Sequence, residues 1–157
     1  MSDMTIHQFC NTHSACAEGR DWAVANCSSM QDAWEKLKPE WLLWVATRTG
    51  VLTDRELRLF AVWCARQVQH LMSDPRSVDA IDVAERYADG KATDDELAAA
   101  RAAARAAASA AAWASAAARE AAGDAAWDAA SARDSAWDAQ ADWLRKNCKP
   151  NFKEAKP

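Results

Sequence analysis

The sequence lacks any long apolar run, any leader-like start and any strand-like alternation. No apolar stretch approaches the ~18–20 residues of a membrane-spanning helix, because charged residues interrupt even the alanine-rich part. No basic and apolar segment with a small-residue cleavage site precedes the first polar residues. No segment alternates apolar and polar residues between turn signals, as a strand does. These absences predict an all-α, cytoplasmic chain.

The motifs of common enzyme classes are also missing. The sequence has no phosphate-binding loop, Ser-His-Asp arrangement, dinucleotide fingerprint or HExxH helix. Cys64 and His70 lie about 120° apart on one expected helix, too far apart for a catalytic pair. The net charge of −4 argues against nucleic acid or an anionic membrane as a partner. We therefore expect a protein that is not an enzyme, has no cofactor and binds neither nucleic acid nor membrane.

What the sequence has in abundance is alanine and tryptophan. The tract from Thr93 to about Asn147 is mostly alanine, the residue with the highest helix propensity. As one rod it would be roughly 80 Å long at ~1.5 Å per residue, whereas a compact chain of this size has a radius of gyration of about 15 Å. We therefore expect a break near Gly123 and Asp124, and a C-terminal alanine-rich helical hairpin. The nine tryptophans would fill the space that alanine leaves.

Start and stop signals divide the rest of the chain into short helices. The starts are capping boxes at Thr5–Gln8, Thr53–Glu56 and Thr93–Glu96, and Asp74 before Pro75; the stops are Gly50 and Gly90. The expected helices lie near 5–11, 14–27, 29–37, 39–49, 54–72 and 75–89, before the alanine tract. Together they predict a compact bundle of about seven helices, with a single domain over 1–148 and a flexible tail over 149–157.

Near the start of the sequence, four residues of zinc-ligand type follow one another at steps of three. They are His7, Cys10, His13 and Cys16, and Cys27 could join them. Each step of three rotates the side chain by about 60° on a helix, so the four wind around it instead of converging. A turn near 11–14 could still bring them together. We favour ordinary packing and expect no metal, with zinc as the alternative.

The final helix carries its acidic residues along one side. At ~100° per residue they fall within a stripe about 120° wide, and the opposite side is almost all alanine. The stripe contains Glu120, Asp124, Asp128, Asp134, Asp138 and Asp142. Like charges four residues apart cost a helix roughly 0.2–0.5 kcal/mol each. Trp113 and Trp127 project along the same side.

This stripe has two interpretations. The simpler one is a solvated face that keeps an alanine-rich hairpin soluble. The other is a docking surface for a basic protein, with the two tryptophans as anchors. The candidate partner-binding residues are Trp113, Glu120, Asp124, Trp127, Asp128, Asp134, Asp138 and Asp142.

Three segments carry a resemblance to a known family. They are PEWLLWVATRTGVLTDRELRLFAVWCARQVQHLM, DPRSVDAIDVAERYADGKATDDELAAARAAARAAA and DAQADWLRKN. In this order they resemble a family of alanine- and tryptophan-rich helical proteins from tailed phages and bacteria, over roughly Ala15 to Phe152. The portion from AERYADG onward is more loosely similar to alanine-rich immunity proteins. Neither family brings catalytic residues to this chain.

The resemblance implies a small helical protein of a phage or mobile element. We expect it to bind, and thereby inhibit, a host or phage protein through the acidic face. One alternative is a structural protein that self-associates into a homo-oligomer through its alanine faces. Another is an immunity-type inhibitor of a toxin.

Overall fold

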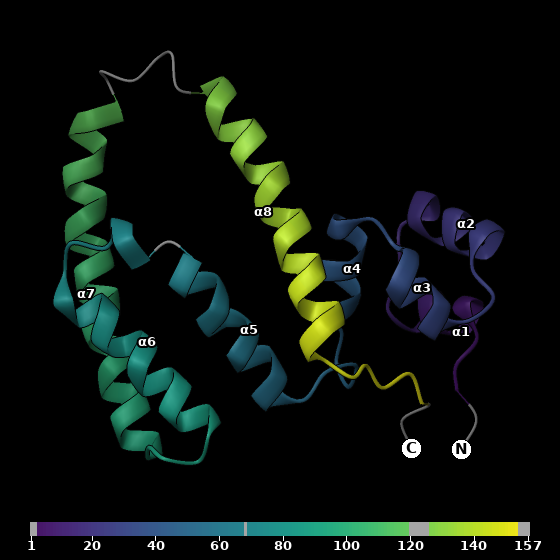
Figure 1. Ribbon diagram of the computed structural model, residues 1–157, viewed down its shortest axis with the longest axis horizontal. Coiled ribbons are helices and arrows are strands. Elements are labelled where there is room, and N and C mark those ends of the chain that lie inside the picture. The colour runs from purple at the N-terminus through teal and green to yellow at the C-terminus, as the bar shows by residue number, and fades with distance from the viewer. Residues whose placement is uncertain (1–2, 68, 120–125, 154–157) are drawn as a thin grey trace. The chain divides into compact units, whose positions relative to one another are not determined.

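The computed structural model describes residues 3–67, 69–119 and 126–153, and the side chains of these residues except those of 107–135. Over these ranges the chain forms eight α-helices and one short 3₁₀-helix (Figure 1). The β-structure of these residues is an isolated antiparallel bridge between Asp3 and Lys153. The predicted all-α class is confirmed. No helix within the described ranges is both long and apolar enough to cross a bilayer.

Contacts between residues divide the chain into two compact units. Unit 1 comprises Met1–Glu56 together with Asp134–Pro157, and unit 2 comprises Leu57–Arg133. Unit 1 is therefore made from two stretches of sequence with the whole of unit 2 between them. The single domain expected over 1–148 stays a prediction.

Unit 1 begins with four short helices whose starts are set by local side chains. They are α1 (Ile6–Thr12), α2 (Ala17–Asn26), α3 (Met30–Lys36) and α4 (Pro39–Ala46). Thr5 and Gln8 form the predicted capping box of α1, while Cys16 and Ser29 accept hydrogen bonds from the first turns of α2 and α3. The expected helices near 5–11, 14–27, 29–37 and 39–49 are thus confirmed, the first shifted by one residue and the other three shorter than expected.

The core of unit 1 is aromatic and draws on both stretches of its sequence. Trp34, Phe9, Leu42 and Leu144 are its largest fully buried side chains. Leu144 comes from α8 (Ala126–Asn147), which belongs to this unit from residue 134. The ring of Phe152 lies 5.7 Å from that of Phe9 and 6.3 Å from that of Trp34. Three aromatic residues distant in sequence therefore share one core.

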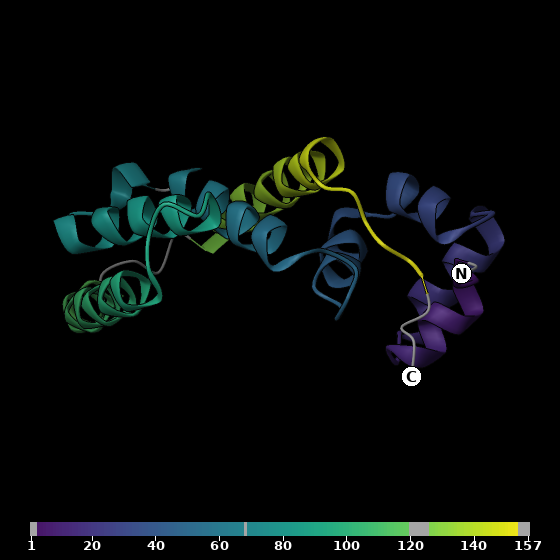
Figure 2. The same cartoon turned by 90° about the horizontal axis from the view of Figure 1, so that it is seen from below.

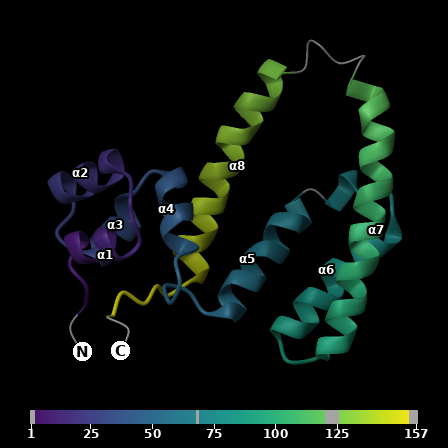
Figure 3. The same ribbon diagram turned by 180° about the vertical axis from the view of Figure 1, so that it is seen from behind.

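Residues 149–153 pack onto unit 1, although the sequence predicted a flexible tail from 149 onward. The N–H of Met4 donates to the carbonyl of Phe152 over 2.8 Å, and the N–H of Asn151 donates to that of Val51 over 2.8 Å. Figure 3 shows this segment running from the end of α8 toward the segment that precedes α1. The physical reason is the buried ring of Phe152, which keeps these residues on the core. Residues 154–157 lie outside the described part.

In unit 2, two helices that are consecutive in sequence pack along each other. Its elements are α5 (Asp54–Gln67, from residue 57), η1 (Gln69–Leu71), α6 (Pro75–Ala88) and α7 (Asp94–Arg119). Helices α6 and α7 lie side by side (Figures 1 and 2). Asp74 caps α6, Thr93 and Glu96 form a capping box, and Gly90 has the positive φ of 71° that a helix stop requires. These local signals were all predicted.

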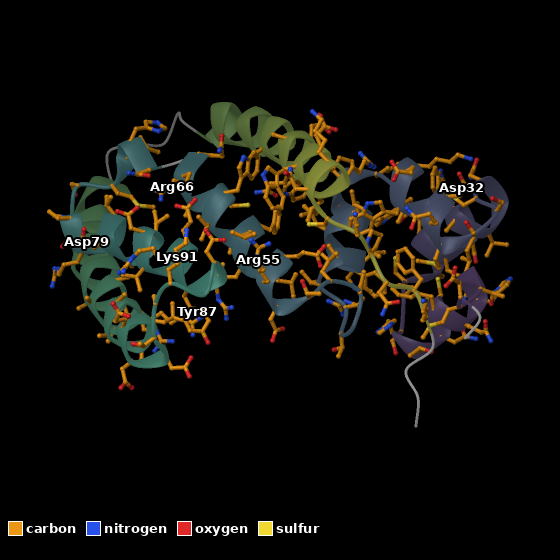
Figure 4. All side chains as sticks on the ribbon, turned by 60° about the horizontal axis from the view of Figure 1, so that its bottom comes forward. Asp32, Arg55, Arg66, Asp79, Tyr87 and Lys91 are labelled. Atoms are coloured by element: carbon orange, nitrogen blue, oxygen red, sulfur yellow. The ribbon has the colours of Figure 1, made fainter. Side chains whose placement is uncertain are left out.

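A guanidinium joins α5 to α6. Arg66 donates to Asp82 over 2.8 Å and to Glu85 over 2.5 Å, in the region where Figure 4 labels it. The hydrogen bonds from Arg66 to Glu85 and Asp82 raise the pKa of the guanidinium further. This contact links the last turn of α5 to two carboxylates of α6. His70 is exposed in η1.

The alanine tract is described as α7 and α8. The break expected at Gly123 and Asp124 lies outside the described residues. The antiparallel hairpin of these two helices stays a prediction, because α8 from residue 134 belongs to unit 1 and α7 to unit 2.

Candidate functional site

The acidic stripe can be followed over the last turns of α8. Asp138 and Asp142 are exposed. Ala141, which lies between them in sequence, and Leu144, which follows them, are buried. Carboxylates therefore point away from unit 1 and apolar side chains point into it, as the sequence predicted. Of the other candidates, Glu120 and Asp124 lie outside the described residues. Trp113, Trp127, Asp128 and Asp134 lie on described helices, but their side chains fall outside the described part.

Arg145, in the last turn of α8, is bound to the end of α3. Its guanidinium donates to the carbonyls of Trp34, over 3.2 Å, and Leu37, over 2.6 Å. These carbonyls belong to the last turn and C-cap of α3, where a helix leaves acceptors unpaired and favours a cation. Arg145 therefore fixes α8 to α3 and is not available as a contact for a partner.

Replacing Arg145 by methionine is expected to lower the free energy of unfolding by about 1.5–3 kcal/mol, the usual range for a hydrogen bond to a charged group. Arg145→Lys should recover only part of this loss, because an ammonium lacks the fork that reaches two carbonyls at once. Urea denaturation followed by circular dichroism measures both. The exposed neighbour Lys146→Met is the control and should stay within about 0.5 kcal/mol of wild type. Equal effects of R145M and K146M would contradict this role.

The four N-terminal residues of zinc-ligand type have separate environments. His7 is exposed, Cys10 is buried, the His13 ring lies 4.5 Å from that of Phe9, and the Cys16 thiol caps α2. In the described part of the chain, no group of three or more His, Cys, Asp or Glu side chains is arranged to hold a metal ion.

A cavity of about 400 Å³, which was not predicted from the sequence, lies between α1, α2, α3 and α4. Its lining is mostly apolar and includes Phe9, Met30, Leu37, Trp41, Trp44 and Val45. The wall formed by α2 combines Arg20 with the small residues Cys16, Gly19 and Ala23, which follow one another at helical spacing. Small residues on one short helix facing a tryptophan-rich helix were the signal available in the sequence.

Gly19 lets the backbone of α2 approach the indole of Trp41. A Cβ at this position would lie 3.3 Å from the Cys16 sulfur and 3.6 Å from the Trp41 ring. The same indole lies 5.7 Å from the ring of Trp22, and the Lys38 ammonium lies 4.9 Å from its centroid. Trp41 is therefore fixed on several sides while one part of it lines the cavity.

The charged groups around the cavity are unevenly distributed. Arg20 and Glu40 line it directly. The guanidinium of Arg48 lies 4.7 Å from the ring centroid of Trp44. The Lys38 ammonium lies at a similar distance from the ring of Trp41. Arg20 also pairs with Asp21, over 2.8 Å, but the Asp21 side chain is 69 % exposed, which makes the pair weak. The surroundings of the cavity are thus more positive than negative.

All five cysteines are free thiols, and their reactivities are expected to differ widely. Burial raises the pKa of the Cys10 thiol, and burial together with Glu56 raises the pKa of Cys148 to about 11. Cys16 is exposed at the edge of the cavity. Because the thiolate is the reactive form, iodoacetamide at pH 8 should alkylate Cys16 at least ~10-fold faster than Cys10 and Cys148. Peptide mapping by mass spectrometry measures the three rates, and equal rates would contradict the buried positions.

Neither a family model, nor a curated protein, nor a solved structure matches this chain.

Proposed function

We propose that the protein is a non-enzymatic, phage-type accessory protein of the cytoplasm that binds a basic host or phage protein and inhibits it. The proposed contact surface is the acidic face of α8. The observation that supports it is the asymmetry of this helix, in which Asp138 and Asp142 are exposed while Ala141 and Leu144 are buried.

The chemistry of this face favours a cationic partner. Asp138 and Asp142 are four residues apart, so they project from the same side of the helix one turn apart. The guanidinium of Arg145 is 3.9 Å from the carboxylate of Asp142, but it donates its hydrogen bonds to the α3 carbonyls. A lysine- or arginine-rich surface would pair with the exposed carboxylates of Asp138 and Asp142, and would associate faster at low salt.

Charge reversal on this face tests the proposal. The purified chain is used to capture proteins from a lysate of its source cell, in parallel with the double variant Asp138→Lys, Asp142→Lys. The matched control is Glu35→Lys, Asp79→Lys, which makes the same change in net charge at exposed positions of α3 and α6. We expect the partner to be captured by the wild type and the control, to be lost with the α8 variant, and to be released by salt.

Circular dichroism of the three proteins confirms that helicity is unchanged. A partner that both double variants retain would show that the acidic face is only solvated. Equal loss with both variants would show that net charge, not this face, determines capture.

A further inference from the structure

We propose that the cavity between α1, α2, α3 and α4 binds a small apolar molecule that carries a single carboxylate. The apolar body would lie against Trp41, Trp44 and Phe9, and the carboxylate would pair with Arg20. This site is independent of the acidic face of α8, because every residue that lines it lies between Ile6 and Val45.

The size and lining of the cavity fit an apolar body. Protein interiors contain few voids larger than a water molecule, and about 400 Å³ falls within the ~300–1,000 Å³ of small-molecule sites. Two indoles and the ring of Phe9 supply flat apolar surface, and Met30 is a side chain that adapts to ligand shape. Gly19 and Ala23 leave the space that larger residues on α2 would occupy.

The charges around the cavity select a carboxylate. Arg20 is the cation of the described lining, and it lies in the first turn of α2, where helix N–H groups also favour an anion. A guanidinium has five N–H donors, so Arg20 can accept a carboxylate in addition to the exposed Asp21. Lys38 and Arg48, on the indoles of Trp41 and Trp44, oppose a cationic ligand.

Glu40 limits the ligand to one negative charge. It is exposed in the first turn of α4 and lines the same cavity as Arg20. Two carboxylates in one ligand would bring the second charge close to Glu40, and like charges repel. A dicarboxylate or a polyphosphate would therefore bind less well than a monocarboxylate.

The test compares three probes with the same ten-carbon chain, namely decanoate, decanol and decylamine, below the concentration at which they form micelles. Binding to the full chain is followed by tryptophan fluorescence and by calorimetry. We expect one decanoate to bind per chain, saturably and about tenfold more tightly than decylamine. The reason is the charge-assisted hydrogen bond with Arg20, which the carboxylate of decanoate can form and the ammonium of decylamine cannot. Arg20→Gln should lower the affinity for decanoate to that for decanol. Lys91→Gln, at an exposed position, should leave the affinity for decanoate unchanged.

A second pair of variants tests the place of binding. Ala23→Leu fills the cavity and should abolish binding of decanoate, whereas Ala25→Leu makes the same change on the exposed side of α2 and should not. If A23L fails to fold, the place of binding can be tested on the wild type. Bound decanoate should cover the Cys16 thiol and slow its alkylation at least ~5-fold.

Three results would overturn the proposal. Absence of both saturable binding and Cys16 protection would show that the cavity takes no such ligand. Equal affinity for decanoate and decylamine, or unchanged decanoate affinity in R20Q, would show that Arg20 does not receive a carboxylate.

Discussion

Replacing Trp34 by alanine is expected to lower the free energy of unfolding by about 3–5 kcal/mol, the usual range for loss of a large buried aromatic side chain. The side chain is 1 % exposed, and its ring packs against Phe152 from the other end of the chain. Natural domains are stable by only ~5–15 kcal/mol, so this single change should remove a large part of the stability. Urea denaturation followed by circular dichroism at 222 nm measures the loss.

Phenylalanine at the same position should behave differently. Among the described residues, the indole N–H of Trp34 is the buried side-chain polar atom without a hydrogen-bond partner. A buried donor without a partner costs about 1–3 kcal/mol, and Trp34→Phe removes this cost while it gives up some volume. We expect W34F to lie within about 1 kcal/mol of wild type. A loss as large as that of W34A would show that the volume of the indole, and not its unpaired N–H, determines the effect.

Replacing Leu144 by alanine is expected to lower the free energy of unfolding by about 2–5 kcal/mol. Leu144 is fully buried on the inner side of α8, where it is one of the four largest buried side chains. Asp138→Ala on the outer side of the same helix is the control and should change stability by less than about 0.5 kcal/mol. The same urea titration measures both, and a D138A effect as large as that of L144A would contradict the asymmetry of α8.

The sequence predicted the helices well because their limits depend on close neighbours. The capping boxes at Thr5, Thr53 and Thr93 each join residues three apart, and all three form as expected. Gly90 directly follows the C-cap of α6 with a positive φ, which a residue without a Cβ adopts at little cost, whereas α4 already ends at Ala46, four residues before Gly50. The inward and outward sides of α8 near Asp138 also followed from helical periodicity alone.

The features that the sequence did not reveal depend on residues far apart. Arg145 reaches carbonyls more than 100 positions earlier, so its role as a link to α3 has no local signature. Phe152 packs on Phe9 and Trp34 for the same reason, and the tail that contains it was expected to be flexible. The cavity also requires the relative placement of four helices, which periodicity within any one of them does not give.

Unit 1 is made from the two ends of the described chain, and this has a consequence for its folding during synthesis. Trp34 and Phe152 are about 120 residues apart, which at ~5–20 residues per second amounts to roughly 6–24 s on the ribosome. During this interval the nascent chain has made Phe9 and Trp34 but not Phe152, whose ring packs on both of them in the folded protein. Chains truncated before Leu144 should therefore expose aromatic surface and aggregate or bind chaperones, even though their first four helices are complete.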